Sequence, residues 1–146
     1  MSHRTYLYCK PDDSSKKAMN FEKNPDAPFT YLLKVATEEI EQTCSELPDP
    51  IRRTLSEVAT VLEEFPSPVH EADGVGSDQL GLFEGADATD PGSPQMPRIV
   101  LWLGNLWDMC EAEEDAYREE VRVTFLHELG HYLGLDEGDL SARGLE

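Results

Sequence analysis

The stretch "TFLHELGHYLGLDEGDL", residues 124–140, holds two histidines four positions apart, with a glutamate directly after the first. Residues four apart lie on one face of an α-helix, one turn above the other, so His127 and His131 can direct their ring nitrogens toward a common point. Two such imidazoles can supply the Zn–N distances of about 2.0–2.1 Å that a zinc ion requires. The spacing therefore predicts a metal site on a helix.

Glu128 points in another direction on the same helix. One residue of α-helix is a rotation of about 100°, so this carboxylate cannot easily join the two imidazoles as a third ligand. It can instead hydrogen-bond a water held on the metal, which is the position of a general base in metal-assisted hydrolysis. We therefore expect His127 and His131 to bind zinc and Glu128 to accept a proton.

A glycine follows this helix and indicates how a third ligand could arrive. Gly134 permits a left-handed turn that bends the chain sharply back, which could bring either Asp136 or Glu137 to the metal as an oxygen ligand. Two imidazoles, one carboxylate and a water form the open tetrahedral site of catalytic zinc. The plain alternative is an amphipathic helix with two histidines by chance, which the glutamate, the glycine and the acids that follow make improbable.

Several segments could position such a helix. Apolar residues recur at helical spacing from Phe29 to Leu47, and the periodicity predicts a helix that ends at Pro48. A short helix or turn is expected next, and the strand-like runs that follow are 57–65, 80–85 and 98–103. Asn105 is a good N-cap residue and predicts a helix that starts there.

The final helix is expected to run from about Ala116 to Leu133. Its apolar side is expected to pack against the sheet and comprises Val121, Phe125, Leu129, Tyr132 and Leu133. Seven acids within residues 105–120 are expected to form a solvated face. Tyr132 stands next to His131 and has two interpretations, an oxyanion stabiliser or a core residue.

Length and charge exclude several classes of function. A chain of 146 residues fits one domain, and 30 acidic against 12 basic residues give a formal charge of −18. That charge repels nucleic acid phosphates and anionic lipid surfaces. No apolar run approaches the roughly 20 residues that span a bilayer, and the N-terminus lacks the apolar region of a secretory signal. We expect no nucleic acid partner, no membrane and a cytoplasmic location.

The remaining histidines and the cysteines carry weaker signals. His3 and His70 are not expected to bind metal, the latter because it should lie exposed in a proline-rich turn. The cysteines number three, are widely scattered and form no CxxC pair, which favours reduced thiols over a disulfide framework or a thiolate zinc site. They are Cys9, Cys44 and Cys110.

The domain organisation follows from a change in composition. Residues 1–28 mix proline, aspartate, serine and lysine with little apolar periodicity, which is typical of a flexible extension. A short ordered piece is expected near Tyr6–Tyr8. Residues 29–146 form the predicted domain.

Within that domain, "HELGHYLGLDE" resembles the HExxHxxGxxD/E signature of the small bacterial zincin-like metallopeptidases, close to the Asp-zincins. The resemblance extends beyond the signature, because "LGLFEG" (80–85), "PRIVLWLGNL" (97–106) and "EEVRVTFLHELGHYLGLDEGDL" (119–140) follow in the order and spacing of that family. It covers approximately residues 29 to 146. The Met-turn of metzincins is absent, since no methionine follows Met109.

The resemblance implies an α+β, minimal zincin-like fold, in which a small mixed β-sheet packs on a backing helix and a C-terminal active-site helix. By the resemblance His127 and His131 bind Zn²⁺ and Glu128 is the catalytic base. The family's third-ligand position falls on Glu137, where aspartate is commoner; the extra methylene requires a more distant backbone, or Asp136 takes the role.

The expected function is a zinc-dependent peptidase, with a peptide or protein as substrate. An extended peptide could add to the strand at 80–84 or to that at 98–103, and the sequence does not choose between them. Only nine residues follow Glu137 to close the cleft, which could mean activation by a protein partner. The alternatives are a non-catalytic acidic interaction module with a structural or vestigial zinc site, and a small zinc endoribonuclease, which Glu128 and the negative charge disfavour.

Overall fold

The computed structural model describes residues 4–7, 27–89 and 94–135, the first of these ranges by its backbone only. The chain forms several helices and one mixed sheet whose outer strands pair antiparallel, so the predicted α+β class is confirmed. The elements are β1 (Arg4–Leu7), α1 (Phe29–Glu46), α2 (Asp49–Arg52), the 3₁₀ helix η1 (Arg53–Glu57), β2 (Ala59–Glu63), α3 (Pro68–Ala72), β3 (Gly81–Glu84), β4 (Arg98–Trp102), α4 (Leu103–Met109) and α5 (Glu114–Tyr132).

The strands form one small mixed sheet in the order β1-β2-β4-β3. β2 and β4 are parallel, with Val61 opposite Val100, whereas β1 pairs antiparallel with β2 and β3 antiparallel with β4. β4 is therefore an inner strand. Of the two strands considered for peptide binding, only β3 keeps one side unpaired within the described residues, so the alternative at 98–103 is wrong.

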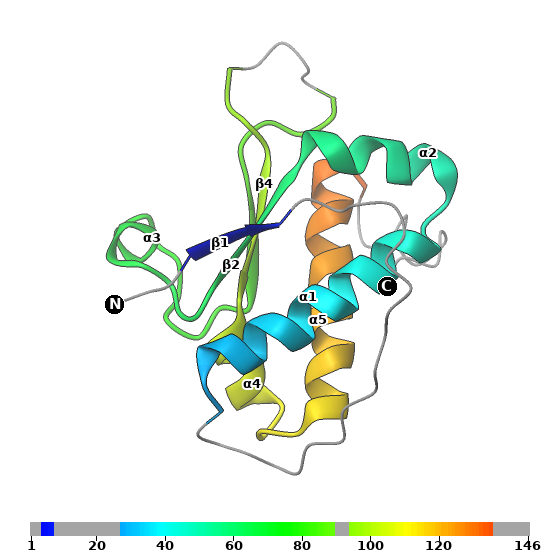
Figure 1. Ribbon diagram of the computed structural model, residues 1–146. Helices are drawn as coiled ribbons and strands as arrows, with labels where there is room; N and C mark the ends of the chain where they lie inside the picture. The colour runs from blue at the N-terminus through cyan, green and yellow to red at the C-terminus, as the bar shows by residue number, and fades with distance from the viewer. Residues whose placement is uncertain (1–3, 8–26, 90–93, 136–146) are drawn as a thin grey trace.

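Three helices cover one face of this sheet. Figure 1 shows α1 crossing α5 on that side, while α3 lies on the other side of the strands. The apolar face of α1 confirms the predicted period, since Leu32, Ala36 and Ile40 are all buried. The core beneath the helices also includes residues of β2, β4, α4 and α5, among them Leu62, Leu101, Leu103, Leu106, Tyr117, Val121, Phe125 and Leu129.

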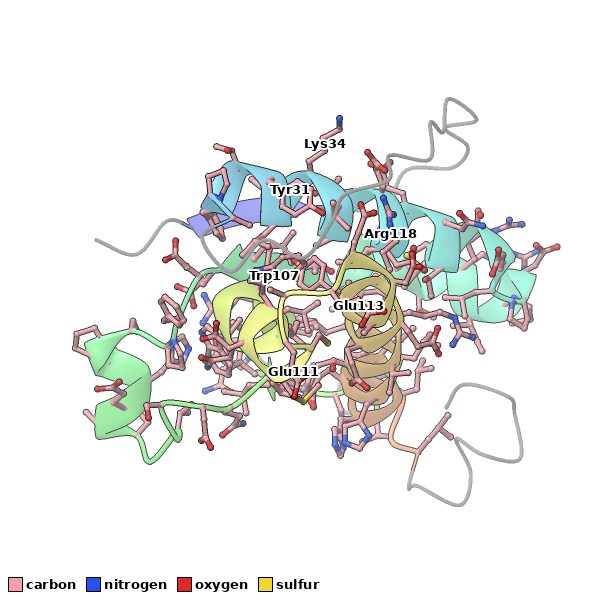
Figure 2. All side chains as sticks on the ribbon, turned by 90° about the horizontal axis from the view of Figure 1, so that it is seen from below. Tyr31, Lys34, Trp107, Glu111, Glu113 and Arg118 are labelled. Carbon is pink, nitrogen blue, oxygen red and sulfur yellow. The ribbon has the colours of Figure 1, made fainter. Side chains whose placement is uncertain are left out.

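An aromatic cluster holds α1, α4 and α5 together at the N-terminal end of α5. Tyr31 and Trp107 lie side by side between α1 and α4 in Figure 2, with ring centroids 5.7 Å apart. Trp107 also meets Tyr117 of α5 edge to face at 5.2 Å. The Tyr117 hydroxyl is buried and donates a hydrogen bond of 2.8 Å to the carbonyl of Leu32. These contacts fix the direction in which α5 crosses the sheet.

Arg118 adds a polar link between α5 and α1. Its guanidinium lies between the two helices in Figure 2 and pairs with Glu38 at 3.3 Å and Glu39 at 3.7 Å. It also reaches Glu114, one turn earlier, at 3.4 Å. Glu114 is only 6% exposed, so the acidic segment 105–120 is not uniformly a solvated face as expected. The pairing with Arg118 explains how that carboxylate is buried.

The second face of the sheet carries a smaller apolar cluster and a buried histidine. The cluster comprises Val61, Val100 and Trp102, with Val75 and Leu82 packed against it. His70 of α3 stacks edge to face on Trp102 and is 7% exposed. Its Nε2 lies 2.6 Å from the Glu84 carboxylate and its Nδ1 3.0 Å from the Ser67 hydroxyl. The expectation of an exposed His70 was therefore wrong, because Glu84 of β3, itself only partly buried, supplies a hydrogen-bond partner for the ring.

Two predicted helix starts also differ from the structure. α4 begins at Leu103 directly after β4, so Asn105 is not its N-cap. Instead the Asn105 amide donates to the carbonyls of Ser77 and Gln79, each at 2.8 Å, and ties the loop before β3 to α4. α5 begins at Glu114, two positions before the expected Ala116.

The beginning of the chain contributes to the sheet. β1 lies inside the segment 1–28 that was expected to be an extension, and it agrees with the short ordered piece expected near Tyr6–Tyr8. Residues 8–26, with Cys9, and residues 1–3, with His3, lie outside the described residues. Among the described elements, no helix is long and apolar enough to cross a membrane.

The cysteines differ from expectation. Cys44 of α1 is disulfide-bonded, so the prediction of three reduced thiols is wrong. Cys110 is a free and buried thiol, and burial together with the nearby Glu120 and Glu113 raises its pKa to about 11. The cytoplasmic location stays a prediction, and a disulfide gives it no support.

Candidate metal centre

α5 carries the predicted site residues on a helix that is anchored by its opposite side. Val121, Phe125 and Leu129 recur at four-residue spacing and are completely buried against the sheet and α1. Burying side chains of this size contributes about 1.5–3 kcal/mol each. The helix therefore has a fixed rotation about its axis, which turns His127 and His131 away from the core.

The end of α5 has the left-handed turn that was predicted at Gly134. This residue has φ +73°, the left-handed conformation that glycine adopts at low cost. Its amide donates to the carbonyl of His131 at 3.1 Å, and the amide of Leu135 donates to the carbonyl of Gly130 at 3.0 Å. These two bonds form a Schellman motif, which ends the helix and reverses the chain.

The two histidines converge as their spacing predicts. The Nε2 atoms of His127 and His131 lie 3.1 Å apart, and the rings meet edge to face with centroids 4.7 Å apart. Two nitrogens bound to one zinc ion at about 2.0–2.1 Å with a tetrahedral angle are separated by about 3.3 Å. The distance between the two Nε2 atoms is therefore close to that expected for two nitrogen ligands of one zinc ion.

Glu128 brings a carboxylate to the same place. One of its oxygens lies 3.9 Å from His131 Nε2, and the three side chains offer ligand atoms that all lie within 4.8 Å of one another. Glu128 is 7% exposed, and its Oε2 is buried without a hydrogen-bond partner among the described residues. Burial raises the pKa of this carboxyl, against the opposing effect of the two imidazoles.

This donor set fits a zinc ion. Imidazole nitrogen and carboxylate oxygen are both ordinary zinc ligands, and a buried carboxylate oxygen with no partner is costly unless a cation or a polar group meets it. The third ligand expected from the sequence, Asp136 or Glu137, lies outside the described residues. Within the described ranges, Glu128 is the only other side chain that offers a possible ligand atom close to the two histidines.

Comparison with known families agrees with this geometry. The family model of zincin-like metallopeptidases matches residues 55–145, which include the sheet strands β2, β3 and β4 and the whole of α5. The chain belongs to the zincin-like metallopeptidases. The fold is accordingly a minimal zincin, with α1 as the backing helix and α5 as the active-site helix. No curated protein matches the chain.

A groove in this zincin-like metallopeptidase leads from the metal centre along α5. Its volume is about 430 Å³, within the range of about 300–1,000 Å³ of ligand pockets. One wall comes from the start of β3 and the segment before it, and the other from α5. The groove is lined by Gln79, Leu80, Gly81, Glu120, Val123, Thr124, His127 and Glu128. Glu120 was not predicted as a site residue, although it stands seven positions before His127 and therefore on the same helix face.

Tyr132 is not part of the metal centre. Its side chain is 4% exposed, and its hydroxyl donates a hydrogen bond of 3.1 Å to the Glu57 carboxylate in η1. The ring also packs against Phe83 of β3, with centroids 5.9 Å apart. Of its two interpretations, the core residue is the one that these contacts support. Burial and the Glu57 carboxylate raise the pKa of the Tyr132 hydroxyl.

Proposed function

We propose that this chain is a zinc-dependent peptidase in which His127 and His131 hold the metal and Glu128 is the general base. The observation that carries the proposal is the convergence of two Nε2 atoms, 3.1 Å apart, beside a buried carboxylate oxygen that has no partner among the described residues. Membership of the zincin-like metallopeptidases supports the same chemistry. When bound, zinc supplies a Lewis acid that polarises the scissile carbonyl and lowers the pKa of a water in the site.

Glu128 is suited to move the proton in this reaction. Its carboxylate accepts the proton of the attacking water and then delivers it to the nitrogen of the leaving amine, so no net proton is gained or lost. A base for this step works best when its pKa is close to the working pH. Burial shifts the pKa of the Glu128 carboxyl in that direction.

The substrate is proposed to lie along β3. β3 is an edge strand of the sheet and packs directly against α5, which carries the metal centre. An extended peptide can pair with such an edge through main-chain hydrogen bonds while its side chains enter neighbouring pockets. The groove lined by Gly81 and His127 supports this proposal, because it could serve as one such pocket beside the metal centre.

The test is the substitution Glu128→Gln in the full chain, with hydrolysis of a mixed peptide library and zinc content measured together. The amide keeps the shape of the side chain but cannot accept the proton. We expect bound zinc to be retained and turnover to fall by a factor of about 10²–10⁴. A chelator should abolish turnover by the unsubstituted protein.

Glu119→Gln provides a matched control, since Glu119 is an exposed carboxylate on the same helix, and the ion pair that it forms with Arg122 is 3.6 Å long. This variant should keep full activity. Turnover by Glu128→Gln equal to that of the control would remove Glu128 from the mechanism. Bound zinc with no cleavage of any peptide would favour the acidic interaction module instead, and cleavage of RNA would favour the endoribonuclease.

A further inference from the structure

Glu120 places a second carboxylate in the groove that opens at the metal centre. The side chains at positions 120, 124 and 127 follow one another along one face of α5, and all three line the groove. The side chain of Glu120 is half-buried. It has no ion pair or hydrogen bond with any other residue in the described parts of the chain, in contrast to Glu114 and Glu119 on the same helix.

Among the described residues, no lysine or arginine lines the groove to balance this charge. Its polar groups besides Glu120 are the amide of Gln79, the hydroxyl of Thr124 and the site residues His127 and Glu128. The buried Oε2 of Glu128 is itself without a partner. A half-buried carboxylate is attracted to a cation more strongly than a fully solvated one is. The groove thus has the charge of a cation-binding pocket.

The shape of the groove favours a long side chain over a free ion. Leu80 and Val123 give it apolar walls, and Glu120 stands about two helical turns from His127, which is roughly 10 Å of helix rise. Lysine and arginine carry an apolar stem with a charge at its end. Such a side chain can extend from a peptide backbone on β3, with its stem against the apolar walls and its charge near Glu120.

We propose that Glu120 determines substrate specificity by selecting peptides with a lysine or arginine next to the scissile bond. The inference rests on the proposed peptidase function and names its substrate class. The same carboxylate excludes acidic side chains by repulsion, so selection has an attractive and a repulsive part. The negative charge of the whole chain, −18, attracts basic peptides in the same sense.

The test measures which peptide bonds the zinc-loaded full chain cleaves in a mixed peptide library, with the products sequenced by mass spectrometry. We expect lysine and arginine to be enriched at one position beside the cleaved bond. The substitution Glu120→Gln should lower that enrichment about tenfold, since it removes one charge-assisted contact. Glu120→Lys should replace it with enrichment of aspartate and glutamate.

Glu119→Gln is again the matched control, because it removes the same charge one residue away from the groove, and it should keep the wild-type preference. Products without basic enrichment at any position, or unchanged enrichment in Glu120→Gln, would overturn the proposal for Glu120. If the wild type cleaves no peptide, the peptidase function fails separately. The pocket is then tested by fluorescence anisotropy with two labelled peptides that differ only in lysine against norleucine. Tighter binding of the lysine peptide that is lost in Glu120→Gln supports the pocket, and equal binding overturns it.

Discussion

Gly81 of β3 lies so close to Thr124 of α5 that a Cβ atom on residue 81 would stand 2.8 Å from Thr124 Cγ2. The same atom would lie 3.1 Å from Leu101 Cδ2 and from the carbonyl of Val100. A glycine is therefore needed where the edge strand meets the active-site helix. This contact sets the width of the groove between them, since both residues line it.

Gly81→Ala should destabilise the protein for this reason. Inserting a methyl group into a packed contact costs about 1–3 kcal/mol, which urea unfolding would measure as a lower midpoint. Adding Thr124→Ala removes the closest clashing atom and should recover part of the loss. A double variant no more stable than Gly81→Ala alone would show that the Thr124 contact does not limit the packing there.

His127 and His70 lie in different environments, so we expect their substitution to affect different properties of the protein. His127→Asn removes one of the two converging nitrogens, so we expect the variant to lose bound zinc as measured by metal analysis. His70→Asn should leave zinc binding unchanged, because His70 packs on the other face of the sheet against Trp102. It should instead lower the free energy of unfolding by about 1–3 kcal/mol, since the Glu84 carboxylate loses a buried partner. Loss of zinc from both variants would contradict separate roles for the two residues.

Tyr132→Phe tests whether this hydroxyl takes part in the reaction. It bonds Glu57 and not the metal centre, so we expect peptide turnover to stay within about twofold of the wild type. Stability should fall by about 0.5–1.5 kcal/mol, the net contribution of one hydrogen bond. A loss of turnover of about 10² or more with normal zinc content would instead make Tyr132 an oxyanion stabiliser.

Features set by neighbouring residues could be predicted from the sequence. The period from Phe29 to Leu47, the convergence of His127 with His131 and the left-handed turn at Gly134 all depend on contacts within about one or two helical turns. Such local geometry is the same wherever the helix lies in the fold. The apolar side of α5 was predictable for the same reason.

Features set by distant segments could not be predicted. Which strand has a free edge depends on the order β1-β2-β4-β3, which no single segment encodes. His70 is buried because Glu84 lies fourteen positions further along the chain, and Asn105 is not an N-cap because its amide bonds carbonyls 26 and 28 positions earlier. The place of Glu120 in a groove could not be predicted either, because β3, which is distant in sequence, forms the other wall of that groove.

Substitution can decide which residue supplies the third zinc ligand, Glu137 or Asp136. Leu135 is the last residue before the two acidic candidates, and its amide donates to the carbonyl of Gly130 in the motif that ends α5. Glu137→Gln and Asp136→Asn each remove one charge with little change in shape. We expect Glu137→Gln to weaken zinc binding at least tenfold, measured by competition with a chromophoric chelator, because a neutral amide oxygen is a poorer zinc ligand than a carboxylate. Asp136→Asn should change the affinity less than twofold. The reverse order of effects would assign the ligand to Asp136, and two normal affinities would place it on neither residue.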